Sequence, residues 1–229
     1  MERHFHEQLQ ELKNRLLEMG ARVEKSIDLA IESLVRRDSP EAEKVIQADD
    51  IINQFEIEID DRCLKLLALQ QPMAGDLRFI TSAMKINNDL ERMGDHAVNI
   101  AERAVTLNSR PSLKPITELP KMAAIAVSMV RESLNCFVNG DAEKARELCK
   151  KDDEVDGYDD RIFHELLTYM TRDKGNVARA LDLLMISKNL ERIADLSTNI
   201  AEEVIFIYKA KTIKHHLNSS DLDDVRSRS

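Results

Sequence analysis

Apolar residues recur every three to four positions along almost the whole chain, which is the spacing of amphipathic helices. The first apolar stripe spans residues 9–34 and stops at the segment 37–40, whose sequence is Arg-Asp-Ser-Pro. In that segment Ser39 is expected to cap the next helix, with Pro40 at its first position. The pattern therefore predicts one long helix before residue 37 and a second one from there to about Gln70.

Turn-forming residues bound four further predicted helices. Gln71-Pro72 makes the turn before the third helix, and Asn139-Gly140 ends the fourth, after which Asp141 caps the fifth. The segment Lys174-Gly175-Asn176 is the turn into the sixth. These four helices are expected to run from about 74 to before Pro111 and over about 121–138, 142–172 and 177–211.

The chain also contains a repeat. The segment LERMGDHAVNIAE, at 90–102, returns as LERIADLSTNIAE at 190–202, with eight of the thirteen positions identical. Short turns make consecutive helices antiparallel. The predicted fold class is therefore all-α, a tandem repeat of two three-helix bundles built from six long antiparallel helices. The expected units are a first bundle at 1–108, a proline-containing linker at 109–120, a second bundle at 121–211 and a polar tail at 212–229.

The amino-acid composition supports this fold and limits the classes of binding partner. Gly (6), Pro (5) and aromatic residues (4%) are scarce, as in all-helical proteins. The net charge of −9 disfavours nucleic acid as a partner and favours cations or a basic protein. The three cysteines form no CxxC pair, and the chain has no leader-like start and no long uncharged apolar run. We therefore expect a cytoplasmic protein with no direct membrane span.

Acidic residues recur at matching places in the two copies. Glu91 and Asp95 are four residues apart and so share one helix face, as do Glu191 and Asp195. This face lies opposite the apolar sector, which places any site on a bundle surface or groove. A second acidic stripe follows the preceding helix of each copy, at an offset of 103 residues: Asp49 and Asn53 in the first copy, Asp152 and Asp156 in the second.

These eight side chains offer oxygen ligands. Hard cations such as magnesium, manganese, calcium and ferric iron prefer such ligands, whereas zinc more often takes His or Cys. His96 follows Asp95 but is replaced by Leu196 in the second copy, so it is expected to be a bystander. The expected cofactor is a divalent or trivalent metal ion, with magnesium, manganese, iron and zinc all open. The alternatives are a metal store or metal-dependent enzyme on the same scaffold, and an inert scaffold with solvated acidic faces.

The repeated LERMGD and LERIAD segments resemble the E(D)xxxD motifs of the PhoU family of phosphate-specific transport system accessory proteins. The segments ADDIINQFEIEID, QQPMAGDLRFI and LLTYMTRDKGNV are similar to that family as well, and the resemblance covers about residues 5–210. Two departures stand out, because Ala194 replaces the usual glycine of the second motif and Asn53 stands where an acid is expected.

The resemblance implies a non-enzymatic, cytoplasmic and commonly homodimeric regulator. Such proteins repress phosphate uptake and the phosphate-starvation regulon. They are thought to act as adaptors between the ATPase PstB of the Pst phosphate ABC transporter and a sensor histidine kinase of the PhoR type. Some members bind metal clusters through the repeated motif. By position, the metal ligands implied here are Glu91, Asp95, Glu191 and Asp195, with Asp49, Asn53, Asp152 and Asp156 on the adjacent helices.

Overall fold

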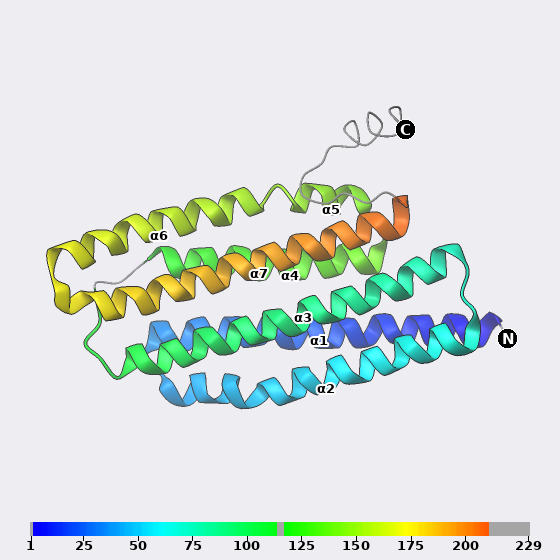
Figure 1. Cartoon of the computed structure of the whole chain (residues 1–229), viewed down its shortest axis with the longest axis horizontal. Coiled ribbons are helices and arrows are strands. Elements are labelled where there is room, and N and C mark those ends of the chain that lie inside the picture. The colour runs from blue at the N-terminus through cyan, green and yellow to red at the C-terminus, as the bar shows by residue number, and fades with distance from the viewer. Residues whose placement is uncertain (1, 114–116, 211–229) are drawn as a thin grey trace, which may run out of the picture.

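The computed structural model describes residues 2–113 and 117–210, and within these ranges the chain is helical with no strands (Figure 1). The helices are α1 (Glu2–Arg36), α2 (Ser39–Gln70), α3 (Ala74–Asn108), α4 (Glu118–Asn139), α5 (Ala142–Leu148), α6 (Asp152–Arg172) and α7 (Val177–Lys209), with a 3₁₀ turn η1 (Lys174–Asn176). The all-α fold with six long helices is thus confirmed. None of the helices described here is long and apolar enough to cross a membrane.

The turn residues place most helix ends where the sequence predicts them. Gly140 ends α4 with a positive φ of 69°, and the side chain of Asp141 accepts a hydrogen bond from the Lys144 amide at 3.0 Å. The expected cap at Ser39 is wrong, because Asp38 performs this role by accepting from the Glu41 amide at 3.2 Å. Ser39 is instead the first helical residue, one position before Pro40.

The predicted fifth helix is interrupted. It forms α5 and α6, separated at residues 149–151 by a tight turn in which the amides of Lys150 and Lys151 bond to carbonyls three residues back, at Glu147 and Leu148. The fourth helix begins at Glu118, three residues before its predicted start, so Pro120 lies in its first turn, where a missing amide donor costs little. The expected polar tail at 212–229, and the predicted end of the last helix near 211, lie outside the described residues.

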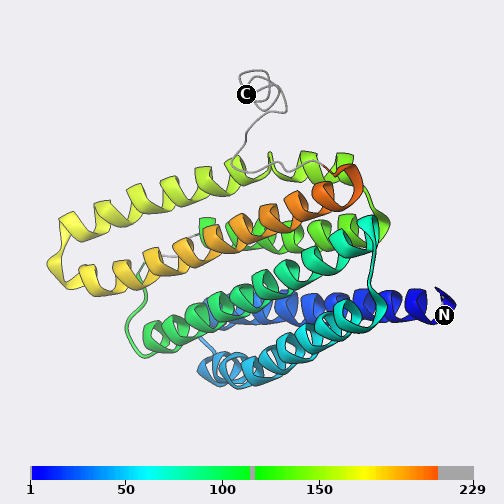
Figure 2. The same cartoon turned by 45° about the vertical axis from the view of Figure 1, so that its right-hand side comes forward.

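The two copies form two bundles that share one core. Helices α1, α2 and α3 pack together, as do α4, α6 and α7, and the bundles meet where α3 contacts α7 and α1 contacts α4 (Figures 1 and 2). Buried apolar side chains from both copies belong to one continuous cluster. At one end of this joint Phe79 of α3 stacks on Phe137 of α4, with ring centroids 5.3 Å apart. The two predicted bundles therefore share a joint core rather than each enclosing a separate one.

Polar residues set the register between α3 and α7. The hydrogen bonds that cross this seam include three between neutral or oppositely charged side chains at matching heights: Ser82 Oγ to Glu203 Oε2 at 2.7 Å, His96 Nδ1 with Asn189 Oδ1 at 2.9 Å, and Arg103 Nη1 to Asp182 Oδ1 at 3.0 Å. Lys85 Nζ also donates to Glu203 Oε1 at 2.7 Å. The two residue numbers add to 285 in the pairs Ser82–Glu203, His96–Asn189 and Arg103–Asp182. Since the copies are offset by 100 on these helices, the first and last pairs occupy equivalent positions. The seam therefore has the symmetry of a two-fold dimer interface within one chain.

Asp89 belongs to the same seam but has no hydrogen-bond donor recorded within the described residues. It lies seven residues after Ser82 and seven before His96, and the register places it opposite Leu196. Only 8% of Asp89 is exposed, and burial raises the pKa of its carboxyl group to about 6, although Arg92 opposes this at 3.8 Å. The equivalent residue of the second copy is the uncharged Asn189.

We predict that Asp89→Asn stabilises the protein in a pH-dependent way. Folding raises the pKa of this carboxyl from 3.8, so its ionised form destabilises the fold and its contribution to the free energy of unfolding falls as pH rises from about 4 to about 6. The variant should be more stable by roughly 2 kcal/mol at neutral pH, and this gain should shrink towards pH 4. Urea unfolding across this pH range tests this, with Asp160→Asn, an exposed carboxylate, as the control. A gain that is the same at every pH would contradict the prediction.

Candidate functional site

The structure brings the acidic residues of the first copy together between α2 and α3. Glu91 and Asp95 come from α3, while Asp49 comes from α2. The pKa of Glu91 is raised, first by burial and then by the charges of Asp95, Glu56 and Asp49, so these three carboxylates all lie close enough to act on Glu91. Asn53 Nδ2 donates to Asp49 Oδ2 at 3.0 Å. All four residues predicted for this copy therefore lie close together between α2 and α3.

Glu56 belongs to this site and was missed by the sequence interpretation. Burial raises the pKa of its carboxyl, and the charges of Asp60 and Asp95 raise it further. A signal was available, because Asp49, Asn53 and Glu56 follow the i, i+4, i+7 spacing of one helix face. We call the set Asp49, Asn53, Glu56, Glu91 and Asp95 the first cluster.

The second cluster repeats this arrangement between α6 and α7. It consists of Asp152, Asp156, Asp159, Glu191 and Asp195, where Asp159 stands at the position of Glu56. Burial raises the pKa of Asp152 to about 6, and the charges of Asp195, Asp156 and Glu191 add to the shift. The four residues predicted for the second copy are therefore close neighbours, and Asp159 is an addition to them.

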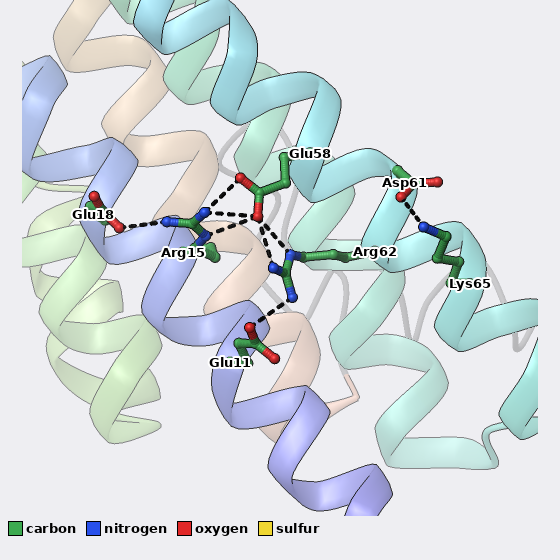
Figure 3. A network of polar contacts seen from close by, with 7 residues as sticks. All are labelled: Glu11, Arg15, Glu18, Glu58, Asp61, Arg62 and Lys65. Carbon is green, nitrogen blue, oxygen red and sulfur yellow. Dashed lines mark hydrogen bonds and ion pairs between the residues drawn. The ribbon is translucent and has the colours of Figure 1, made fainter.

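The opposite face of α2 shows what paired carboxylates look like in this protein. There Glu58 accepts three hydrogen bonds from Arg15 of α1, at 2.7, 2.8 and 3.0 Å, and a fourth from Arg62, which also pairs with Glu11 (Figure 3). These cations, Arg15 first, lower the pKa of Glu58. Glu56, two residues away on the other face of α2, has a raised pKa, first because it is buried and then because the charges of Asp60 and Asp95 act on it.

Comparison with known proteins identifies the family. The model of the PhoU domain matches residues 16–104 and again residues 119–204. The chain belongs to the PhoU family. It is 41% identical to the "Phosphate-specific transport system accessory protein PhoU homolog" of Clostridium acetobutylicum, over 91% of this chain and 96% of that protein. Its identity to the protein of the same name from Aquifex aeolicus is also 41%, over 91% of this chain and 94% of that one.

Solved PhoU structures have the same fold. The crystal structure of PhoU from Pseudomonas aeruginosa superposes with a TM-score of 0.87 at 37% identity, covering 90% of this chain and all of that one (100%). The phosphate transport system regulatory protein PhoU from Streptococcus pneumoniae gives a TM-score of 0.84 at 31% identity, covering 92% and 99%. The duplicated bundle found here is therefore the architecture of the PhoU family.

The two clusters fit a hard cation by their chemistry. Their ligand atoms are all oxygens, and in each cluster one carboxylate oxygen, Asp49 Oδ1 or Asp152 Oδ1, is buried without a hydrogen-bond partner in the described part of the chain. No group of three or more His, Cys, Asp or Glu side chains within the described ranges is already arranged to hold a metal ion. A cation in each cluster would give its orphaned oxygen a partner. It would also offset the like-charge repulsion that adds to the effect of burial in raising the pKa values of Asp49 and Asp152.

His96, in contrast, faces the α3–α7 seam. Its Nδ1 pairs with the side-chain oxygen of Asn189, and burial lowers the pKa of its imidazole. Its role in the structure is to join the two motif helices, as suits the bystander that the sequence predicted.

A glycine brings the α3 backbone close to the first cluster. A Cβ added at Gly94 would lie 3.1 Å from Ile52 Cδ1, 3.2 Å from Ile52 Cγ2 and 3.6 Å from Asp49 Oδ1. In the second copy Ala194 replaces this glycine, and the residue equivalent to Ile52 is the smaller Val155. The methyl group gained on one helix is thus matched by a methyl group lost on the facing helix.

We predict that Gly94→Ala and Ile52→Val compensate each other. Alanine at 94 should gain about 1 kcal/mol of helix propensity but lose most of it to crowding against Ile52. Ile52→Val alone should cost about 1 kcal/mol. The double variant should be more stable than the sum of the single effects by about 0.5–1 kcal/mol, measured as a double-mutant cycle of urea unfolding free energies. Additive effects would show that the two positions do not constrain each other.

Proposed function

We propose that this chain is a non-enzymatic regulator of phosphate uptake, located in the cytoplasm, that restrains transport and represses the phosphate-starvation regulon. The observation that carries this proposal is the match to relatives named phosphate-specific transport system accessory proteins over nearly their full length. A solved relative is titled a phosphate transport system regulatory protein, which supports the same role. The proposed partners are the ATPase subunit of the transporter, of the PstB type, and a sensor histidine kinase of the PhoR type. The proposed form is a homodimer.

In this proposal the two carboxylate clusters bind metal ions. When bound, the metal supplies positive charge that neutralises carboxylates facing one another across a helix–helix seam. The residues that would hold it are Asp49, Asn53, Glu56, Glu91 and Asp95 in the first copy and Asp152, Asp156, Asp159, Glu191 and Asp195 in the second. Magnesium, manganese and iron suit these oxygen ligands best, and zinc stays open.

Such clusters also suggest how a regulator changes state. Asp49 and Asp95 repel each other across the α2–α3 seam, as Asp152 and Asp195 do across the α6–α7 seam. The repulsion favours helices that move apart, whereas a bound cation favours helices held together. A ligand shifts a conformational equilibrium only by binding one state better than the other, and a cation between facing carboxylates satisfies that condition.

The second candidate function is a metal store or a metal-dependent enzyme on the same scaffold. It is favoured by the same orphaned oxygens of Asp49 and Asp152. The two functions differ in what they require outside the cluster, because a regulator needs a protein partner and an enzyme needs a substrate.

We predict that Asp95→Ala combined with Asp195→Ala removes metal without unfolding the protein. Metal per chain, measured by elemental analysis, should fall to background while helicity by circular dichroism stays near that of the wild type. Without metal the variant should be slightly more stable, by about 0.2–0.5 kcal/mol per relieved like-charge pair, and added metal should no longer stabilise it. The exposed pair Asp160→Ala and Glu147→Ala is the matched control. Unchanged metal content in the cluster variant would overturn the site assignment.

We predict that the wild-type chain, used as bait in cells grown with high phosphate, co-purifies with the transporter ATPase or the sensor kinase. A deletion strain should show raised phosphate uptake and an induced starvation regulon under the same conditions. Light scattering of the purified chain tests the homodimer. Normal uptake and normal regulon output in the deletion strain would refute the regulatory role and leave the metalloprotein alternative.

A further inference from the structure

The second cluster already contains a cation, supplied by the chain itself. Lys188 Nζ lies 2.7 Å from Asp159 Oδ2 and 3.8 Å from Glu191 Oε1. The charge of Asp156 also acts on Lys188, and the charge of Lys188 in turn opposes the rise in the pKa of Asp195. The lysine ammonium group therefore interacts with four of the five carboxylates in this cluster.

Asp159 depends on this lysine. It is only 5% exposed, and its two oxygens are satisfied by Ser187 Oγ at 2.7 Å and by Lys188 Nζ. A buried carboxylate needs such partners, since an unpaired charge in the interior is costly. At this position the second copy thus has a complete internal ion pair.

The first copy lacks this pair. Asn88 stands at the position of Lys188, is exposed and carries no charge. Asn87, at the position of Ser187, donates to the main-chain oxygen of Glu56 and to Asp60 Oδ1. Within the described residues no donor is recorded for the carboxylate of Glu56. The cation recorded as acting on the first cluster, Arg92, offsets only part of the rise in the pKa of Glu91.

The differences between the copies keep the charge of the two clusters equal. The second cluster has an acid, Asp156, where the first has Asn53, but it also has the ammonium of Lys188 where the first has Asn88. Five carboxylates less one ammonium leave a formal charge of −4, the same as the four carboxylates of the first cluster. The extra acid and the extra base therefore belong together.

We propose that Lys188 is the resident cation of the second cluster, and that the first cluster is the one that takes an exchangeable hard cation tightly. A tethered ammonium occupies its place without the entropic cost of capturing a free ion. A metal ion entering the second cluster must displace Lys188 from Asp159 or bind beside it against like-charge repulsion. The inference rests on metal binding as part of the proposed function, and it makes the two halves unequal in that function.

The test exchanges Lys188 and Asn88 between the two copies. Each exchange is made in a variant in which the other cluster has been disabled. Asp95→Ala leaves the second cluster and Asp195→Ala leaves the first, and Mn²⁺ binding to the full chain is measured by equilibrium dialysis and calorimetry. In the Asp95→Ala background, Lys188→Asn should tighten Mn²⁺ binding by about tenfold or more, while Lys188→Arg, which keeps the charge, should leave it weak. In the Asp195→Ala background, Asn88→Lys should weaken binding by a similar factor.

The outcomes separate this inference from the proposed function. Two wild-type sites of equal affinity that neither exchange alters would overturn the role of Lys188 and leave metal binding intact. No Mn²⁺ binding to the wild-type chain would overturn both. If Lys188→Asn leaves Asp159 without its partner and unfolds the protein, the exchange at Asn88 decides alone, because that position is exposed. An unchanged affinity there would refute the inference.

Discussion

The packing of α3 against α7 is the contact on which the rest of this structure depends. Both motif helices are buried along this seam, and polar pairs such as Ser82–Glu203 and Arg103–Asp182 fix a single register. Polar pairs specify alignment more strictly than apolar contacts do, because a shift would leave buried charges without partners. With this seam fixed, Asp95 is left to interact with α2 and Asp195 with α6. The two clusters are therefore consequences of how the bundles join.

Much of the fold could be predicted from the sequence because its signals are local. Helical periodicity and turn chemistry at Gly140 and Asp141 act within a few residues. The break at 149–151 could not be predicted in this way, since Cys-Lys-Lys contains no helix breaker. A tertiary contact accompanies this break, because Lys151, the last residue of the turn, forms an ion pair with Glu132 of α4 at 2.7 Å. The equivalent segment 46–48 of α2 continues as helix.

The residues of the candidate site likewise fall into those that could be predicted from the sequence and those that could not. The eight predicted residues were found because they recur as motifs, and all eight gather into the two clusters. Glu56 and Asp159 were missed, although each lies seven residues after a predicted aspartate, Asp49 or Asp152, and so shares its helix face. The role of Lys188 was not visible from spacing alone. The sequence places it three residues before Glu191, but its closer contact is with Asp159 on another helix.

Positions at which the two copies differ in a correlated way say more about the constraints on each cluster than the positions that are identical in both copies. An extra methyl at Ala194 occurs with a smaller residue at Val155, and the extra acid Asp156 occurs with the extra base Lys188. Each change alone would crowd or charge a site that packing already constrains. When the two changes occur together, the second change restores the packing volume or the net charge that the first one altered. The halves thus keep one architecture while their clusters differ in composition. Under the proposed function, this difference would give a duplicated protein two sites that need not respond to the same ion concentration.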